Sequence, residues 1–89
     1  MTPEQKELLR HAILLQLEAA SPASLPAETI LQGVKLAGHR IGREILSKEL
    51  QYLGGKGLLK EKPKTITKSA RRYQVTAAGV DYLEEQGLV

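Results

Sequence analysis

The most concentrated chemistry in this sequence is positive charge on one short segment. Residues 60–73 hold six basic side chains and one acidic one, a net charge of +5, whereas residues 1–59 carry +1 and residues 74–89 carry −3. A basic block of this kind indicates a polyanionic partner. The alternative is a solvated hairpin, whose lysines keep exposed strand edges from pairing with other chains. The charged residues of the block are Lys60, Glu61, Lys62, Lys64, Lys68, Arg71 and Arg72.

A helix with one polar side is expected just before the basic block, over residues 43–53. At about 100° per residue, Leu46, Leu50 and Leu53 share one face of this helix. The other side is polar and open to a partner. Glu44 and Lys48 also have the i,i+4 spacing of an exposed ion pair, which is worth roughly 0.2–0.5 kcal/mol. The polar positions are Arg43, Glu44, Ser47, Lys48 and Gln51.

Residue types needed for catalysis and metal binding are scarce. The sequence has no cysteine, which excludes disulfides, thiolate metal sites and cysteine nucleophiles. His11 and His39 have no paired carboxylate motif nearby, so solvated or hydrogen-bonded histidines are expected. The glycine-rich run over residues 54–57 has the composition of a phosphate-binding loop, but it follows a helix and precedes a strand, which is the wrong order. We therefore expect no catalytic site, no metal and no cofactor, and a protein that is not an enzyme.

Length and composition indicate one small domain covering residues 1–89. The sequence contains neither Phe nor Trp, so the core must be built from Leu, Ile, Val and Ala. No apolar run approaches the roughly 20 residues that span a bilayer, and the N-terminus has no apolar signal core. Together with the absence of cysteine, these features predict a cytoplasmic protein with no membrane partner.

Capping residues divide the chain into its expected helices and strands. Thr2 and Gln5 form a capping box, Gly42 and Thr76 are placed as N-caps, and Gly38 is placed to end a helix. Helices are expected over residues 3–19, 26–37, 43–53 and 77–86, and strands over residues 58–62 and 71–75. The first helix should be the central packing helix, since it has a wide apolar face. That face comprises Leu8, Leu9, Ala12, Ile13, Leu15 and Ala19.

The order of elements and two local phrases resemble the winged helix-turn-helix superfamily. Residues 50–59 read LQYLGGKGLL, similar to the L-x-x-L-x-x-K-G-L-I that ends the recognition helix in MarR, ArsR and PadR repressors. Residues 72–79 read RYQVTAAG, similar to the Y-x-L-T-x-x-G that closes the wing and opens the next helix. The resemblance covers nearly the whole chain. It implies an α+β winged helix-turn-helix, with a three-helix core, a β-hairpin wing, a C-terminal helix and a short edge strand near residues 21–26.

The resemblance also implies how DNA would be bound. The helix over residues 43–53 would enter the major groove, while the wing over residues 60–73 would touch the backbone or the minor groove. Candidate base contacts are Arg43, Glu44, Ser47, Lys48 and Gln51, whose side chains can bond to base edges. Candidate backbone or minor-groove contacts are Lys62, Lys64, Lys68, Arg71 and Arg72, with Arg40 in the turn before the helix. On this interpretation the protein is a small transcriptional regulator that binds double-stranded DNA, either at specific sequences or in general.

Other partners follow from the same features. A homodimer through the first helix and the C-terminal helix would serve DNA binding, because two half-sites multiply affinity. The alternative function is a winged-helix protein–protein interaction module, an adaptor or complex subunit without specific DNA binding, since helix 43–53 is less basic than a typical DNA reader. RNA binding through the basic wing is a third option. The salt dependence of nucleic-acid binding separates the DNA-binding protein from the adaptor.

Overall fold

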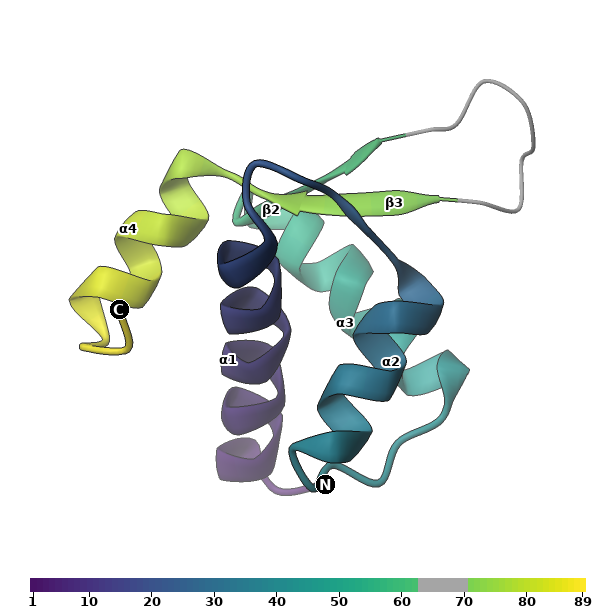
Figure 1. Ribbon diagram of the computed structural model, residues 1–89. Coiled ribbons are helices and arrows are strands. Elements are labelled where there is room, and N and C mark those ends of the chain that lie inside the picture. The colour runs from purple at the N-terminus through teal and green to yellow at the C-terminus, as the bar shows by residue number, and fades with distance from the viewer. Residues whose placement is uncertain (63–70) are drawn as a thin grey trace.

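Figure 1 shows the computed structural model, which describes residues 1–62 and 71–89. In chain order the elements are α1 (Pro3–Ala20), β1 (Leu25–Pro26), α2 (Ala27–Leu36), α3 (Arg43–Gly55), β2 (Leu59–Lys62), β3 (Arg72–Val75) and α4 (Ala77–Glu85). α1 stands between α2 and α4, and the β2–β3 hairpin extends away from the helices (Figure 1). None of the helices within the described residues is long and apolar enough to cross a membrane. The expected α+β class and order of elements are confirmed.

α1 begins where the sequence predicts. The Thr2 hydroxyl accepts a hydrogen bond from the Gln5 amide at 3.1 Å, and the Thr2 amide donates to Gln5 Oε1 at 2.9 Å. This capping box satisfies two of the backbone groups that a helix start leaves without partners. The helix then runs to Ala20, one residue beyond the expected end.

The buried face of α1 differs from the predicted one. The expectation is wrong for Leu8, whose residue is 59% exposed, and for Ala19, which is also exposed. α1 contacts α2, β3 and α4 at once, so these three neighbours together select which of its many apolar positions are buried. The buried residues of α1 are Leu9, Ile13, Leu14 and Leu17. They join a single core with Ile30, Leu31, Val34, Ile41, Leu46, Leu50, Leu53, Leu59, Val75 and Leu83.

A short turn joins α2 to α3 and forms the helix-turn-helix. Gly38 ends the α2 segment with φ at +97°, a backbone conformation that glycine adopts without steric cost. Gly42 is the N-cap of α3, as expected. On either side of it, Ile41 and Leu46 are both buried in the core, at the spacing of a hydrophobic staple. α3 continues to Gly55, two residues beyond its expected end.

The three strands form an antiparallel sheet in the order β1-β3-β2. Leu25 of β1 lies opposite Tyr73 of β3, and Leu59 of β2 lies opposite Val75. β1 is the short edge strand that the resemblance implied between the first two helices. Because β3 pairs with both neighbours, the root of the hairpin is joined to the segment that leads into α2.

α4 begins directly against the hairpin. The Thr76 hydroxyl accepts a hydrogen bond from the Gly79 amide at 3.0 Å and donates one to the Gly57 carbonyl at 2.6 Å. Gly79 is buried, and a Cβ at this position would overlap the backbone carbonyl oxygen of Leu58. The glycine that closes the family-like phrase over residues 72–79 therefore lets α4 approach the hairpin backbone.

Candidate nucleic-acid interface

The polar face of α3 is open to solvent. Leu46, Leu50 and Leu53 are buried on the opposite side of the helix, as expected. Within the described residues, Glu44 and Lys48 do not form the ion pair that their spacing allows. The charges of these two residues therefore do not neutralise each other through a direct contact. The residues predicted to contact bases, all exposed, are Arg43, Glu44, Ser47, Lys48 and Gln51.

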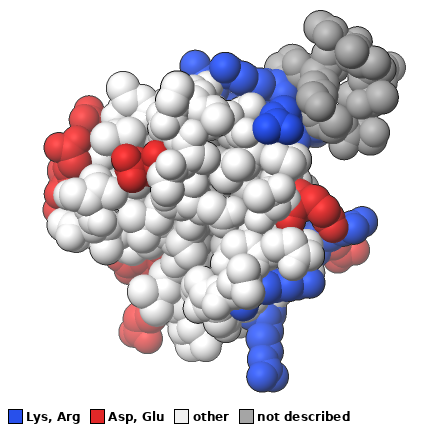
Figure 2. All heavy atoms as spheres, viewed as in Figure 1, with Lys and Arg blue, Asp and Glu red and all other residues white. Residues whose placement is uncertain are grey.

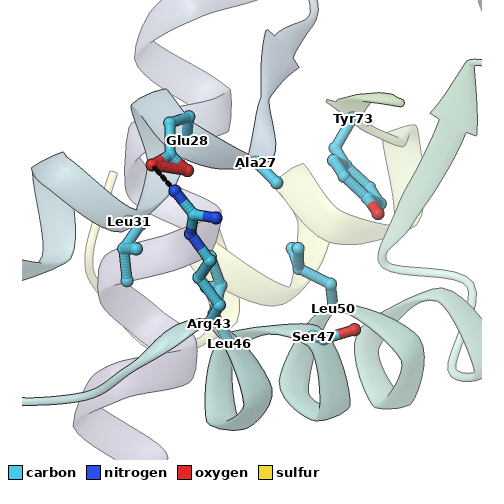
Figure 3. A pocket seen from close by; sticks show the side chains of 8 residues that line it. All are labelled: Ala27, Glu28, Leu31, Arg43, Leu46, Ser47, Leu50 and Tyr73. Carbon is cyan, nitrogen blue, oxygen red and sulfur yellow. Dashed lines mark hydrogen bonds and ion pairs between the residues drawn. The ribbon is translucent and has the colours of Figure 1, made fainter. Parts of the chain in front are cut away.

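One side of α3 forms the wall of a groove that reaches the hairpin. Ser47 and Gln51 line it from α3, while Arg71 and Tyr73 line it from the root of the hairpin. A second hollow continues along α3, shares Ser47 and Tyr73 with the first, and includes Arg43 (Figure 3). The structure thus brings three of the predicted base contacts beside a predicted wing contact.

The basic residues of the hairpin differ from one another in their surroundings. Lys62 at the end of β2 is exposed. Arg71 Nε lies 3.0 Å from Glu61 Oε1, and both side chains are exposed. Lys64 and Lys68 lie outside the described residues, so their contacts with the backbone or minor groove remain predictions.

Arg72 belongs to the hairpin, but its side chain is hydrogen-bonded to the segment before β1. Its Nε donates a hydrogen bond to Ser24 Oγ at 2.9 Å, and its Nη2 donates to the Ser24 carbonyl at 2.7 Å. Gln74 adds a bond from its amide nitrogen to the Pro22 carbonyl at 2.6 Å. These bonds attach β3 to the segment before β1. A phosphate that bound Arg72 would compete with them, and the predicted DNA contact of this residue remains a prediction.

Arg40 lies apart from the groove. It lines a separate hollow together with Met1 and Leu8 from the start of the chain and Ile45 from α3. Met1, Leu8 and Ile45 are exposed apolar residues, each at least 41% accessible. Arg40, in the turn before α3, therefore lies away from Ser47 and the root of the hairpin.

Tyr73 belongs to the groove although it was not among the predicted contacts. Burial raises the pKa of its hydroxyl above the ordinary value of 10.0, the Glu61 carboxylate acts in the same direction, and Arg71 opposes them. The phenol therefore keeps its proton at neutral pH and can donate a hydrogen bond to an acceptor in the groove. The sequence signal that points to Tyr73 is its place in the phrase RYQVTAAG, which resembles the end of the wing in the winged helix-turn-helix superfamily.

Glu28 lines the second hollow and is another residue that the sequence pattern did not identify. It lies in the first turn of α2, and Arg43 Nη2 donates a hydrogen bond to its Oε1 at 2.7 Å (Figure 3). The two residues belong to different helices, so neither the i,i+3 nor the i,i+4 rule relates them. Only the packing of α2 against α3 makes this contact.

The far side of α3 is attached to α1 by an ion pair. Arg10 Nε donates to Glu49 Oε2 at 2.5 Å, and the guanidinium carbon lies 3.8 Å from the centroid of the Tyr52 ring. The bond with Glu49 raises the pKa of Arg10 above its ordinary value, although burial opposes this. Glu49 is a buried charged residue, only 7% exposed. The pair therefore restrains how α3 sits on α1.

Charge is unevenly distributed over the molecule (Figure 2). Acidic side chains gather at the edge formed by α4, basic ones lie at the root of the hairpin, and the side of α2 and α3 carries both kinds. The acids of α4 are Asp81, Glu84 and Glu85, and this helix has no Lys or Arg. A polyanion would accordingly be attracted to the side of the groove and repelled from α4.

No protein-family model matches the chain, and no curated protein matches it in sequence. Solved structures match its fold. A mutant of MepR from a multidrug-resistant S. aureus clinical isolate gives a TM-score of 0.77 at 15% identity, over 100% of this chain and 67% of that one. The PcaV transcriptional regulator of Streptomyces coelicolor, in complex with its natural ligand, gives a TM-score of 0.72 at 22% identity. The match covers 99% of this chain and 54% of PcaV.

A mutant of Lactococcus lactis ZitR gives a TM-score of 0.60 at 17% identity, over 98% of this chain and 51% of that one. The chain thus spans only about half of the length of PcaV and ZitR. At these identities the likeness concerns the fold. Together with the element order and the sheet topology, it shows that the chain has the winged helix-turn-helix fold of MarR-family regulators.

Proposed function

We propose that this chain binds double-stranded DNA as a small transcriptional regulator in the cytoplasm. The observation that carries the proposal is the groove shared by the polar side of α3 and the root of a hairpin whose segment, residues 60–73, has a net charge of +5. α3 would enter the major groove, and the wing would lie on the backbone or the minor groove. The fold shared with the PcaV transcriptional regulator supports this assignment.

The chemistry of the α3 face suits recognition of base edges. Arg43 and Lys48 can donate to guanine, Gln51 can pair with adenine, and Ser47 can bond to several bases. Glu44 can accept a hydrogen bond from cytosine. Because all five side chains are exposed, they can reach a duplex without rearrangement of the core.

The hairpin charges predict a steep dependence of DNA binding on salt. If about four of them contact phosphates, the slope of log K against log salt should be roughly −3.6 per protomer. Lys64→Ala/Lys68→Ala should make that slope shallower by about two units, because each lost phosphate contact removes about one. Fluorescence anisotropy on a random duplex, measured across a salt series, gives both slopes.

A variant with the same loss of charge elsewhere separates contact from net charge. Lys6 near the start of α1 and Lys35 in the last turn of α2 are exposed. These ends of the two helices lie at the opposite end of the molecule from the hairpin (Figure 1). Lys6→Ala/Lys35→Ala should leave the slope close to that of the wild type. Weak binding that is indifferent to salt and to both double variants would contradict DNA binding and favour a protein-interaction module. Tighter binding to duplex RNA than to DNA would redirect the proposal to RNA.

We further propose that the protein acts as a homodimer through α1 and α4. Leu8 on α1 and Leu88 and Val89 after α4 are exposed apolar residues, which supports a contact surface at these places. Leu8→Glu should weaken the dimer at least about tenfold, because it places a charge in an apolar contact. Analytical ultracentrifugation measures this. Leu36→Glu, at an 89% exposed position on α2, should leave the dimer intact, and a wild-type protein that is monomeric at high concentration would contradict the proposal.

A further inference from the structure

The strongest unexplained contact on the groove side of the molecule is the ion pair between Glu28 and Arg43. The two groups meet at 2.7 Å, although their side chains are 56% and 79% exposed. Such exposed pairs contribute little to folding stability. The pair also joins the first turns of α2 and α3, the two helices of the helix-turn-helix. A contribution to folding stability therefore does not explain why a carboxylate stands at this position.

The position of Glu28 is unfavourable for a protein that simply attracts DNA. Glu28 lines the same hollow as Arg43, Ser47 and Tyr73 (Figure 3). A carboxylate on that side of the molecule repels phosphates of every sequence equally. It also neutralises the one arginine among the predicted base contacts. Both effects lower the affinity for DNA in general.

Figure 3 shows the guanidinium of Arg43 extended towards Glu28 and across the hollow. The guanidinium is a planar fork of fixed geometry, suited to two parallel hydrogen bonds with one partner. To contact DNA it must exchange its bond to Glu28 for a new one. A bidentate bond to the O6 and N7 atoms of guanine can replace it, whereas a single bond to another base edge replaces it less well.

We infer that Glu28 is a specificity-determining residue that acts by positioning Arg43. The carboxylate holds the guanidinium across the hollow and releases it to a bidentate acceptor such as guanine. Contacts with other sequences do not compensate for the lost ion pair. This inference rests on the proposed binding of double-stranded DNA and assigns to Glu28 a role within it.

The test compares two duplexes, a random one and one selected from a random library with the wild-type protein. Glu28→Gln keeps the size of the side chain and removes its charge. It should tighten binding to the random duplex about fivefold and change binding to the selected duplex less than twofold. The ratio of the affinity for the selected duplex to that for the random duplex therefore falls. Glu84→Gln on α4 removes the same charge far from the groove and should leave the ratio unchanged; within the described residues Glu84 makes no ion pair.

A double-mutant cycle shows whether Glu28 acts through Arg43. In an Arg43→Ala background, Glu28→Gln should no longer change the ratio of affinities, and only a general electrostatic effect, equal on both duplexes, should remain. A ratio that does not fall in Glu28→Gln, or that falls equally without Arg43, would overturn the inference while DNA binding stands. A wild-type protein that selects no duplex and binds none with a salt dependence overturns the proposed function, and this role of Glu28 with it. Thermal unfolding of each variant checks that the protein remains folded after the exposed ion pair is changed.

Discussion

Alanine in place of Gly79 is expected to destabilise the protein by roughly 3 kcal/mol. A Cβ at this position would overlap the carbonyl oxygen of Leu58 and lie 2.7 Å from Val75 Cγ2. Neither neighbour can move alone, because the Leu58 carbonyl also accepts the Thr76 amide at 3.2 Å and Val75 is buried in the core. The first turn of α4 must therefore withdraw from the hairpin, and core contacts are lost with it.

Thermal unfolding followed by circular dichroism measures this effect. At about 4–8 °C per kcal/mol for a domain of this size, the midpoint should fall by roughly 12–24 °C. Gly55→Ala is the matched control, since a Cβ there meets nothing within 4 Å. It should leave the midpoint within a few degrees of the wild type or raise it slightly, because alanine favours a helix more than glycine does. Equal midpoints for the two variants would contradict the close approach of α4.

Gly33 offers an intermediate case that tests the same reasoning. A Cβ at Gly33 would overlap the side-chain amide of Gln16, which is the flexible end of a long side chain. Gln16 can swing away and lose its hydrogen bond to the Thr29 carbonyl, at 3.1 Å in the wild type. Gly33→Ala should therefore cost about 1 kcal/mol or less, clearly less than Gly79→Ala.

Removing Arg10 is the second change with a large expected effect. Arg10→Ala leaves the Glu49 carboxylate at a buried position without its partner, and breaking a buried pair in this way costs about 3–5 kcal/mol. The Arg10 side chain is 25% exposed, so water can reach part of the site and we expect about 2–3 kcal/mol instead. The contact of the guanidinium with the Tyr52 ring is lost at the same time.

A paired substitution separates the charge left behind from the loss of packing. Arg10→Met/Glu49→Leu replaces both ions by apolar groups of similar length, and such replacements are often neutral or stabilising. Its free energy of unfolding in urea should lie within about 1 kcal/mol of the wild type. Arg10→Lys should fall between the two, because lysine keeps the charge but lacks the planar fork. If the paired variant is as unstable as Arg10→Ala, the ion pair is not the reason for the loss.

Features with local causes could be predicted from the sequence. The capping box of Thr2 and Gln5, the N-caps at Gly42 and Thr76 and the turn at Gly38 all depend on residues within four positions of one another. The start of every helix was therefore predicted to within one residue, and the polar face of α3 followed from helical spacing alone. The winged helix-turn-helix order was recognisable because these short-range signals occur in a known sequence along the chain.

Features that depend on the packing of distant segments could not be predicted in the same way. Leu8 and Leu14 both lie in the apolar α1 helix, and the elements packed around α1 decide that Leu14 is buried and Leu8 is exposed. Glu49 is a charged residue of α3, yet it is buried against Arg10, which lies 39 residues earlier in the sequence. The contact of Glu28 with Arg43 could not be predicted for the same reason, because it joins two different helices.

The order of strands in the sheet has a consequence for how the protein is made. β3 lies between β1 and β2, so neither of the earlier strands has a partner until the last one is synthesised. Ser24, just before β1, and Arg72 of β3 are joined by hydrogen bonds although they are 48 residues apart. Closing so large a loop is entropically costly, and contacts of this kind slow folding. On a ribosome the helical segments through α3 emerge first, and the sheet can assemble only after residue 75 has left the exit tunnel.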